Sequence, residues 1–253
     1  MNFALDEYAH LNSILHRWDP RFKLIGFAGL IFAFSFVQDL YVLPAMALVT
    51  GAIFLISRLP VSFVLYRLRY PSIFLLMVIL ILPFLSGETV IFSIGPLDVR
   101  EEGLVSVLLI ATRFLCILTL GLILFGTAPF LTTIKAMRAL GLPPILADMT
   151  LLTFRYLSEI GDYLHRMEAA LRLRGFNARR FSFHGLGTLS WLGGSILVRS
   201  YERSEWVYKA MIMRGYGQRK SSGEGFEYSI FDSMVLGIAL LLAAGFVAAQ
   251  IVL

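Results

Sequence analysis

The sequence is short of cysteine, charge and grouped histidine. Cys116 is the only cysteine among 253 residues, so no intrachain disulfide can form. Charged residues make up 15% of the chain and hydrophobic residues 58%, whereas soluble domains carry about 25% charged residues. The histidines lack the spacing of a metal site; they are His10, His16, His165 and His184. These shortages argue against a disulfide-framed domain, an ordinary soluble domain and a resident metal centre.

The sequence also lacks the local motifs of nucleotide binding and hydrolysis. It contains no G-x-x-x-x-G-K-[ST] phosphate loop, no H-E-x-x-H pair and no G-x-S-x-G elbow. The stretch GQRKSSGEG at 217–225 has the composition of a phosphate loop but not its order. We therefore expect a chain that is not an enzyme, with no catalytic residues, no metal ligands and no cofactor of its own.

Long apolar runs are what the sequence has in abundance. A run of about 18 or more apolar residues is long enough to cross the hydrocarbon core of a bilayer. We predict five membrane spans: 22–38, 40–57, 71–86, 103–125 and 229–253. The predicted fold class is therefore all-α, a polytopic helical membrane protein embedded in the lipid bilayer.

The distribution of lysine and arginine predicts the orientation of these spans. Cytoplasmic segments carry an excess of Lys and Arg. If the N-terminus is inside, all of the 22 Lys and Arg except Arg100 and Arg113 lie on the cytoplasmic side or at its edge, and the acid-rich loop 87–102 lies outside. The net charge of +5 is then explained by membrane orientation, so we expect no nucleic-acid partner. The predicted location is the inner (cytoplasmic) membrane.

The chain divides into three predicted regions. They are 1–126, with an N-terminal surface helix at about 5–15 and four spans; 127–228, a cytoplasmic region; and 229–253, the last span. Proline and glycine divide the cytoplasmic region into helices. These are predicted at about 128–140, 144–174 and 186–214.

The second of these helices is amphipathic. Its apolar residues recur three or four apart, as expected for one face of a helix. They are Met149, Leu152, Tyr156, Ile160, Tyr163, Met167 and Leu171. The third helix carries a similar face, with Leu197, Tyr201, Tyr208 and Met211.

One heptapeptide pattern, Ala-x-x-x-Arg-Gly-aromatic, closes both long helices. The matching residues are Ala170, Arg174 and Gly175 in ALRLRGF, and Ala210, Arg214 and Gly215 in AMIMRGY. A helix C-cap explains the glycine and the basic residue. It does not require an aromatic residue after the glycine or a small residue four positions before the arginine. We interpret the two copies as two similar contact sites for a partner that has two similar binding surfaces, or sockets.

Arg113 is the one ionisable residue well inside a predicted span, which makes it a candidate intramembrane functional residue. Two other interpretations stay open. Arg113 would either face the carbonyl groups of a neighbouring helix or snorkel to the membrane surface.

The chain resembles the transmembrane (T) component of energy-coupling factor (ECF) transporters, and most closely the cobalt-type members, CbiQ. Three stretches carry the resemblance: DPRFKL at 19–24, LLTFRYLSEIGDYLHRMEAALRLRGF at 151–176, and VRSYERSEWVYKAMIMRGYG at 198–217. The family's two Ala-Arg-Gly-type motifs fall on the two copies of the heptapeptide. The chain departs from the family where alanine often precedes the arginine, because Leu173 and Met213 stand there.

The resemblance implies a function that explains the duplication. In the family, two coupling helices end in these motifs and dock on two ATP-binding-cassette ATPase subunits, which bind the ATP and magnesium. The T component links these ATPases to a separate substrate-capture membrane subunit. The resemblance thus implies a non-catalytic ABC importer subunit for cobalt uptake and cobalamin biosynthesis.

Several alternatives differ from this interpretation in substrate or class. A T component for nickel or a vitamin would share the same motifs. An ordinary ABC permease would carry Glu-Ala-Ala, three residues and then Gly, whereas EAALRLRG at 168–175 has four intervening residues. A polytopic membrane enzyme would need converging polar groups near the spans, and a scaffold would need no ATPases at all.

Overall fold

The computed structural model describes residues 13–85, 90–94, 97–176, 183–217 and 230–252. Its contacts group these residues into two compact units, one within Gly141–Gly225 and one formed by Phe3–Leu140 with Phe226–Leu253. Helix α6 (Phe130–Ala139) packs on α2 (Pro20–Phe36) and so lies in the second unit, which we call the bundle. The predicted surface helix at 5–15 lies almost entirely outside the described residues.

The bundle is helical, as predicted. Besides α2 and α6 it contains α1 (Ile14–Arg17), α3 (Leu43–Ser57) after a 3-10 turn (Leu40–Val42), α4 (Val61–Leu85), α5 (Glu101–Gly126) and α9 (Ile230–Val252). Within the described residues, four segments are long and apolar enough to span a membrane: Leu40–Ser57, Val61–Pro83, Glu102–Gly126 and Ile230–Val252. The first predicted span forms α2, a helix of 17 residues whose core face includes the buried Phe27, Leu30 and Phe34.

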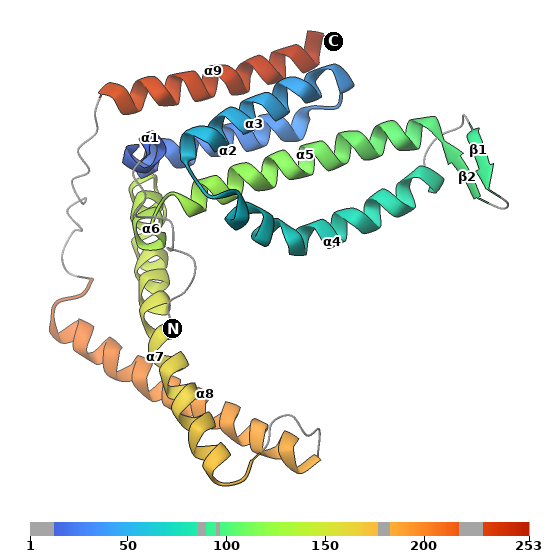
Figure 1. Cartoon of the computed structure of the whole chain (residues 1–253). Coiled ribbons are helices and arrows are strands. Elements are labelled where there is room, and N and C mark those ends of the chain that lie inside the picture. The colour runs from blue at the N-terminus through green and yellow to red at the C-terminus, as the bar shows by residue number, and fades with distance from the viewer. Residues whose placement is uncertain (1–12, 86–89, 95–96, 177–182, 218–229, 253) are drawn as a thin grey trace. The chain divides into compact units, whose positions relative to one another are not determined.

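The third predicted span belongs to a helix that starts earlier than expected. Helix α4 begins at Val61, not near Pro71, so most of the expected loop 58–70 is helical. Pro71 and Pro83 both lie inside the helix, where neighbouring groups in membrane proteins commonly compensate for the missing hydrogen bond. Figure 1 shows that α4 is bent, and interior proline is a usual cause of bending.

The expected outer loop 87–102 contains a short β-hairpin. Strand β1 (Val90–Ile94) pairs antiparallel with β2 (Leu97–Arg100), and the register shifts between Val90 and Phe92. The hairpin joins the end of α4 to the start of α5 (Figure 1).

Helices α2 and α9 run side by side in the same direction. Near the start of both, Trp18 Nε1 donates a hydrogen bond to the carbonyl oxygen of Asp232 (3.2 Å). Near the end of both, Gln250 Oε1 accepts from the backbone N–H of Gln38 (2.8 Å). The first turns of α2 and of α9 therefore lie at one end of the bundle.

Helix α5 runs opposite to α2 and α4. At its last residue, Gly126, an added Cβ would lie 3.3 Å from the ring of Phe63, near the start of α4. Arg113, in its first half, contacts the final turn of α2. The starts of α2, α4 and α9 and the end of α5 therefore share one end of the bundle. This arrangement agrees with the alternating spans expected from the sequence.

Candidate functional site

The other unit of the fold, within Gly141–Gly225, consists mainly of two long helices. Helix α7 (Pro144–Leu173) and helix α8 (Phe183–Met213) correspond to the helices predicted at about 144–174 and 186–214. Pro143 occupies the N-cap of α7, and Gly141 before it has a φ of +113°, a left-handed conformation that glycine adopts readily. The predicted breaks at glycine and proline are therefore present.

Helix α7 ends in a Schellman motif, which we call the first tip (170–176). Arg174 is the C-cap residue, and its N–H donates to the carbonyl oxygen of Ala170 (3.2 Å). Gly175 has a φ of +83° and donates to Arg172 (3.0 Å). The N–H of Phe176 donates to Leu171 (3.0 Å). This pair of backward bonds satisfies carbonyl groups that a helix end leaves open.

Helix α8 ends in the same motif, the second tip (210–216). Gly215 has a φ of +80° and donates to the carbonyl oxygen of Ile212 (2.9 Å), while the N–H of Tyr216 donates to Met211 (3.0 Å). The aromatic residues Phe176 and Tyr216 thus occupy the position after the glycine that often packs back on the last helical turn. The backbone N–H of each aromatic residue takes part in the cap, and a docking role for its side chain stays a prediction.

Capping does not account for the side chains before the glycines. Leu173 is 91% exposed and Met213 is 82% exposed, and both Arg174 and Arg214 are exposed. Within the described residues, neither of these two guanidinium groups has a hydrogen-bond or ion-pair partner. Nearby basic residues differ, because Arg172 lies 3.8 Å from Glu168 and Lys209 lies 2.9 Å from Glu205. Each tip therefore presents one apolar and one cationic side chain to its surroundings.

The two tips lie at opposite ends of an antiparallel pair of helices. Arg203 of α8 lies 3.1 Å from Glu159 of α7, and Tyr216 Oη donates to Asp148 Oδ2 (2.9 Å) near the start of α7. The second tip is thus beside the first turns of α7, whereas the first tip is at its end. From Asp148 to Arg174 the helix rises about 40 Å at about 1.5 Å per residue. The pair holds two similar tips well apart.

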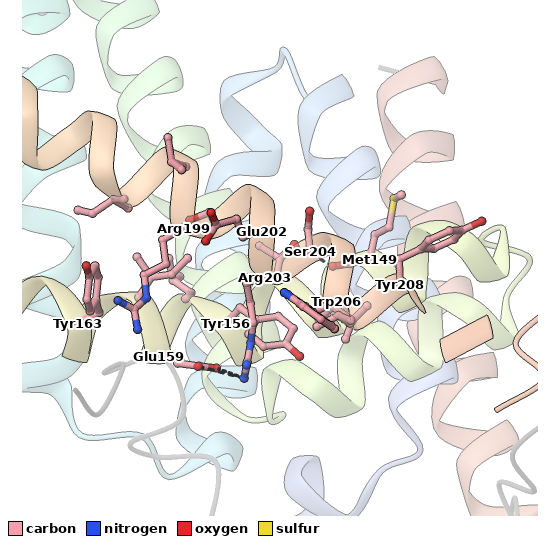
Figure 2. Close-up of a pocket in the computed structure, with 18 of the residues that line it drawn as sticks. Met149, Tyr156, Glu159, Tyr163, Arg199, Glu202, Arg203, Ser204, Trp206 and Tyr208 are labelled. Carbon is pink, nitrogen blue, oxygen red and sulfur yellow. Dashed lines mark hydrogen bonds and ion pairs between the residues drawn. The ribbon is translucent and has the colours of Figure 1, made fainter. Parts of the chain in front are cut away.

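The facing sides of α7 and α8 form an open groove with a volume of about 1600 Å³. Five residues of the predicted apolar stripe line it, namely Met149, Leu152, Tyr156, Ile160 and Tyr163. Figure 2 shows Tyr156 and Tyr163 of α7 facing Arg199 and Arg203 of α8 across this groove. Trp191 (83% exposed) and Trp206 (71% exposed) also line it. The amphipathic faces of the two helices thus line an open surface, and Ala147 is the one fully buried residue of α7 in the described part of the chain.

Arg113 contacts carbonyl groups of a neighbouring helix, which is one of the interpretations that the sequence left open. Its Nη1 donates to the carbonyl oxygens of Ser35 and Val37, both at 3.2 Å. These carbonyls belong to the C-terminal end of α2, where a cation complements the helix dipole. The geometry makes Arg113 a tie between α5 and α2; a transport role for it stays a prediction.

Within the described residues there is no group of three or more His, Cys, Asp or Glu that would hold a metal ion. His10 lies outside the described residues. His165 is 4.0 Å from Glu168 on the exposed surface of α7, and His16 Nδ1 is 2.7 Å from Ser13 Oγ. These contacts are local and bring no further ligands together.

Comparison with known proteins gives a consistent result. The family model described as "Cobalt transport protein" (CbiQ) matches residues 11–224. The chain is 28% identical to the "Energy-coupling factor transporter transmembrane protein EcfT" of Bacillus selenitireducens, over 98% of this chain and 97% of that protein. It is 30% identical to the protein of the same name from Brevibacillus brevis, over 85% of each chain.

A third relative of that name, from Lactococcus lactis, is 28% identical over 93% of each chain. The similarity therefore covers both the bundle and the helix pair with its two tips. On the match of the family model and of these near full-length relatives, the chain belongs to the CbiQ family and is a transmembrane (T) component of an energy-coupling factor transporter.

Proposed function

We propose that α7 and α8 are coupling helices, and that each tip docks on one of two ATP-binding-cassette ATPase subunits. The observation that carries this proposal is the pair of similar tips, each with an exposed arginine and an exposed apolar residue, at opposite ends of one helix pair. Two similar tips match a partner that has two equivalent binding surfaces, which we call sockets. Each socket is the ATPase surface that receives one tip.

The proposed division of labour leaves the chemistry to the partners. The ATPase subunits bind ATP and magnesium, a separate membrane subunit captures the substrate, and this chain transmits the motion without catalysis. In this proposal the chain needs no metal or nucleotide of its own. The proposed substrate is cobalt, supported by the description of the matching family model; nickel or a vitamin is the alternative cargo.

Uptake by a reconstituted complex tests this function. Proteoliposomes containing this chain, its ATPases and its capture subunit should accumulate radioactive Co²⁺ when ATP is present on the ATPase side. ATPases with a substituted phosphate-loop lysine serve as the control and should give no uptake. Accumulation of nickel or a vitamin in place of cobalt would correct the substrate alone. ATP-independent accumulation of any of them would contradict the coupling function.

We also propose that the end of the bundle where α2, α4 and α9 begin faces the cytoplasm. The basic residues support this orientation, since Arg67 and Arg69 lie in the first turns of α4, and Lys135 and Arg138 lie on α6.

Single cysteines in a Cys116→Ser background test this orientation. Sites within 87–102 should react with an impermeant maleimide added outside intact cells. Sites within 58–70 and 177–185 should react only after the membrane is opened. External labelling of 177–185 would place the tips in the wrong compartment and overturn the proposal.

A further inference from the structure

A line of polar and aromatic contacts crosses the groove between α7 and α8. The guanidinium of Arg203 lies 3.1 Å from the carboxylate of Glu159. One turn away, the guanidinium carbon of Arg199 lies 4.2 Å from the centre of the Tyr163 ring. We call these four residues the seam (Figure 2). Because Glu159 and Tyr163, and also Arg199 and Arg203, are four residues apart, each helix presents its pair on one face.

The backbones of α7 and α8 do not pack closely at the glycines beside the seam, so backbone contact there does not fix how the two helices cross. Small residues let helix backbones approach each other, but a Cβ added at Gly193 or Gly194 of α8 would meet no atom within 4 Å. The groove separates the facing sides of the helices, and long side chains bridge it. The seam side chains Glu159 and Arg203 are themselves about half exposed, so they are free to adjust without opening a core.

The seam lies where a small rotation has a large effect on the tips. Arg174 lies eleven positions after Tyr163, and Arg214 lies fifteen positions after Arg199, which gives arms of about 17 Å and about 23 Å. A rotation of about 15° at the seam moves the tips by about 4 to 6 Å on arms of this length.

We propose that the seam is a positioning element: it sets the crossing of α7 and α8 and so holds the two tips at the separation that fits two sockets. The inference rests on the proposed function, because that function gives the tip separation its purpose. Two linked contacts gain from each other only when geometry lets both form at once. Loss of the seam should therefore weaken docking even though Arg174 and Arg214 are intact.

The test combines a distance measurement with a binding measurement. Spin labels at Leu173→Cys and Leu189→Cys, in full-length Cys116→Ser protein in nanodiscs, report the opening between the helices. Arg203→Ala with Tyr163→Leu removes both seam contacts. We expect this variant to shift the mean label distance by about 4 Å, from the same arm lengths, and to broaden its distribution. Tyr163→Phe keeps the ring face and should behave as wild type.

Binding of the ATPase pair is then measured without labels. The seam-broken variant should bind about 10-fold or more weakly, since part of the gain from double attachment is lost. A separate variant with the charges exchanged, Glu159→Arg with Arg203→Glu, keeps the ion pair and should match the wild type in both readouts; Glu202→Ala should alter neither. Unchanged distances, or changed distances with wild-type binding, would overturn the inference. Failure of the proposed function is separate: the ATPases would then bind equally well when Arg174 and Arg214 are replaced.

Discussion

Replacement of Arg174 and Arg214 together by alanine is expected to abolish ATP-driven uptake, while membrane insertion and binding of the capture subunit persist. The planar guanidinium makes several directed donor contacts at once, which lysine does not copy. Truncation of one member of a desolvated charged contact costs about 2 to 5 kcal/mol. This corresponds to about 30-fold to a few thousand-fold weaker docking at each tip.

The exposure of both arginines makes the experiment decisive. Within the described residues their side chains have no partner, so their loss removes little from the fold. If their only role is to complement the helix dipole, each change costs about 0.3 to 1 kcal/mol of helix stability, and uptake nearly survives. Arg172→Ala with Lys209→Ala is the matched control, because it removes one paired basic residue from the last turns of each helix. The control should transport, whereas the double alanine and double lysine variants of Arg174 and Arg214 should not.

The second large effect is expected from Leu173→Asp combined with Met213→Asp. Side chains that are 91% and 82% exposed contribute little to folding, so the change should alter stability by no more than about 0.5 kcal/mol. In a socket, each new carboxylate would lose water and compete with the partner for the neighbouring guanidinium, and breaking a buried charged contact costs several kcal/mol. We therefore expect uptake to fall by more than about 100-fold, the equivalent of about 3 kcal/mol.

The controls for this prediction separate contact from folding. Thermal unfolding of the purified variant should match that of the wild type. Alanine often precedes the arginine in the family that the sequence resembles. Leu173→Ala with Met213→Ala should therefore retain most of the uptake. Normal uptake by the double aspartate variant would mean that these two side chains stay in water during transport.

The parts of the fold that local patterns encode were predictable from the sequence. The apolar period of α7, with Pro144 at its start and Gly175 after its end, predicted the helix bounds closely. The start of α4 was missed because Pro71 resembles a helix boundary, whereas the surrounding membrane helix accommodates it. Whether the apolar stripe would close a core or line a groove depends on how α8 packs, and no local pattern carries that information.

The candidate site was likewise predictable only where a local sequence pattern encodes it. The duplicated heptapeptide located both tips, but backbone geometry was needed to assign Phe176 and Tyr216 to the capping motif. Glu159 and Arg203 are distant in the sequence and follow no local spacing rule, so their contact was not predictable. Likewise, Arg113 stood out as a charge within a span, yet its carbonyl partners on α2 emerged only from the packing of α5.

The central claim is that each tip fills one ATPase socket, and the most direct measurement is the affinity of the purified ATPase pair for the full-length chain in nanodiscs. We predict tight binding by the wild type. We also predict comparable weakening by Arg174→Ala and by Arg214→Ala, by at least about 30-fold each, and no detectable binding by the double variant. Equal affinity of the double variant and the wild type would contradict the claim.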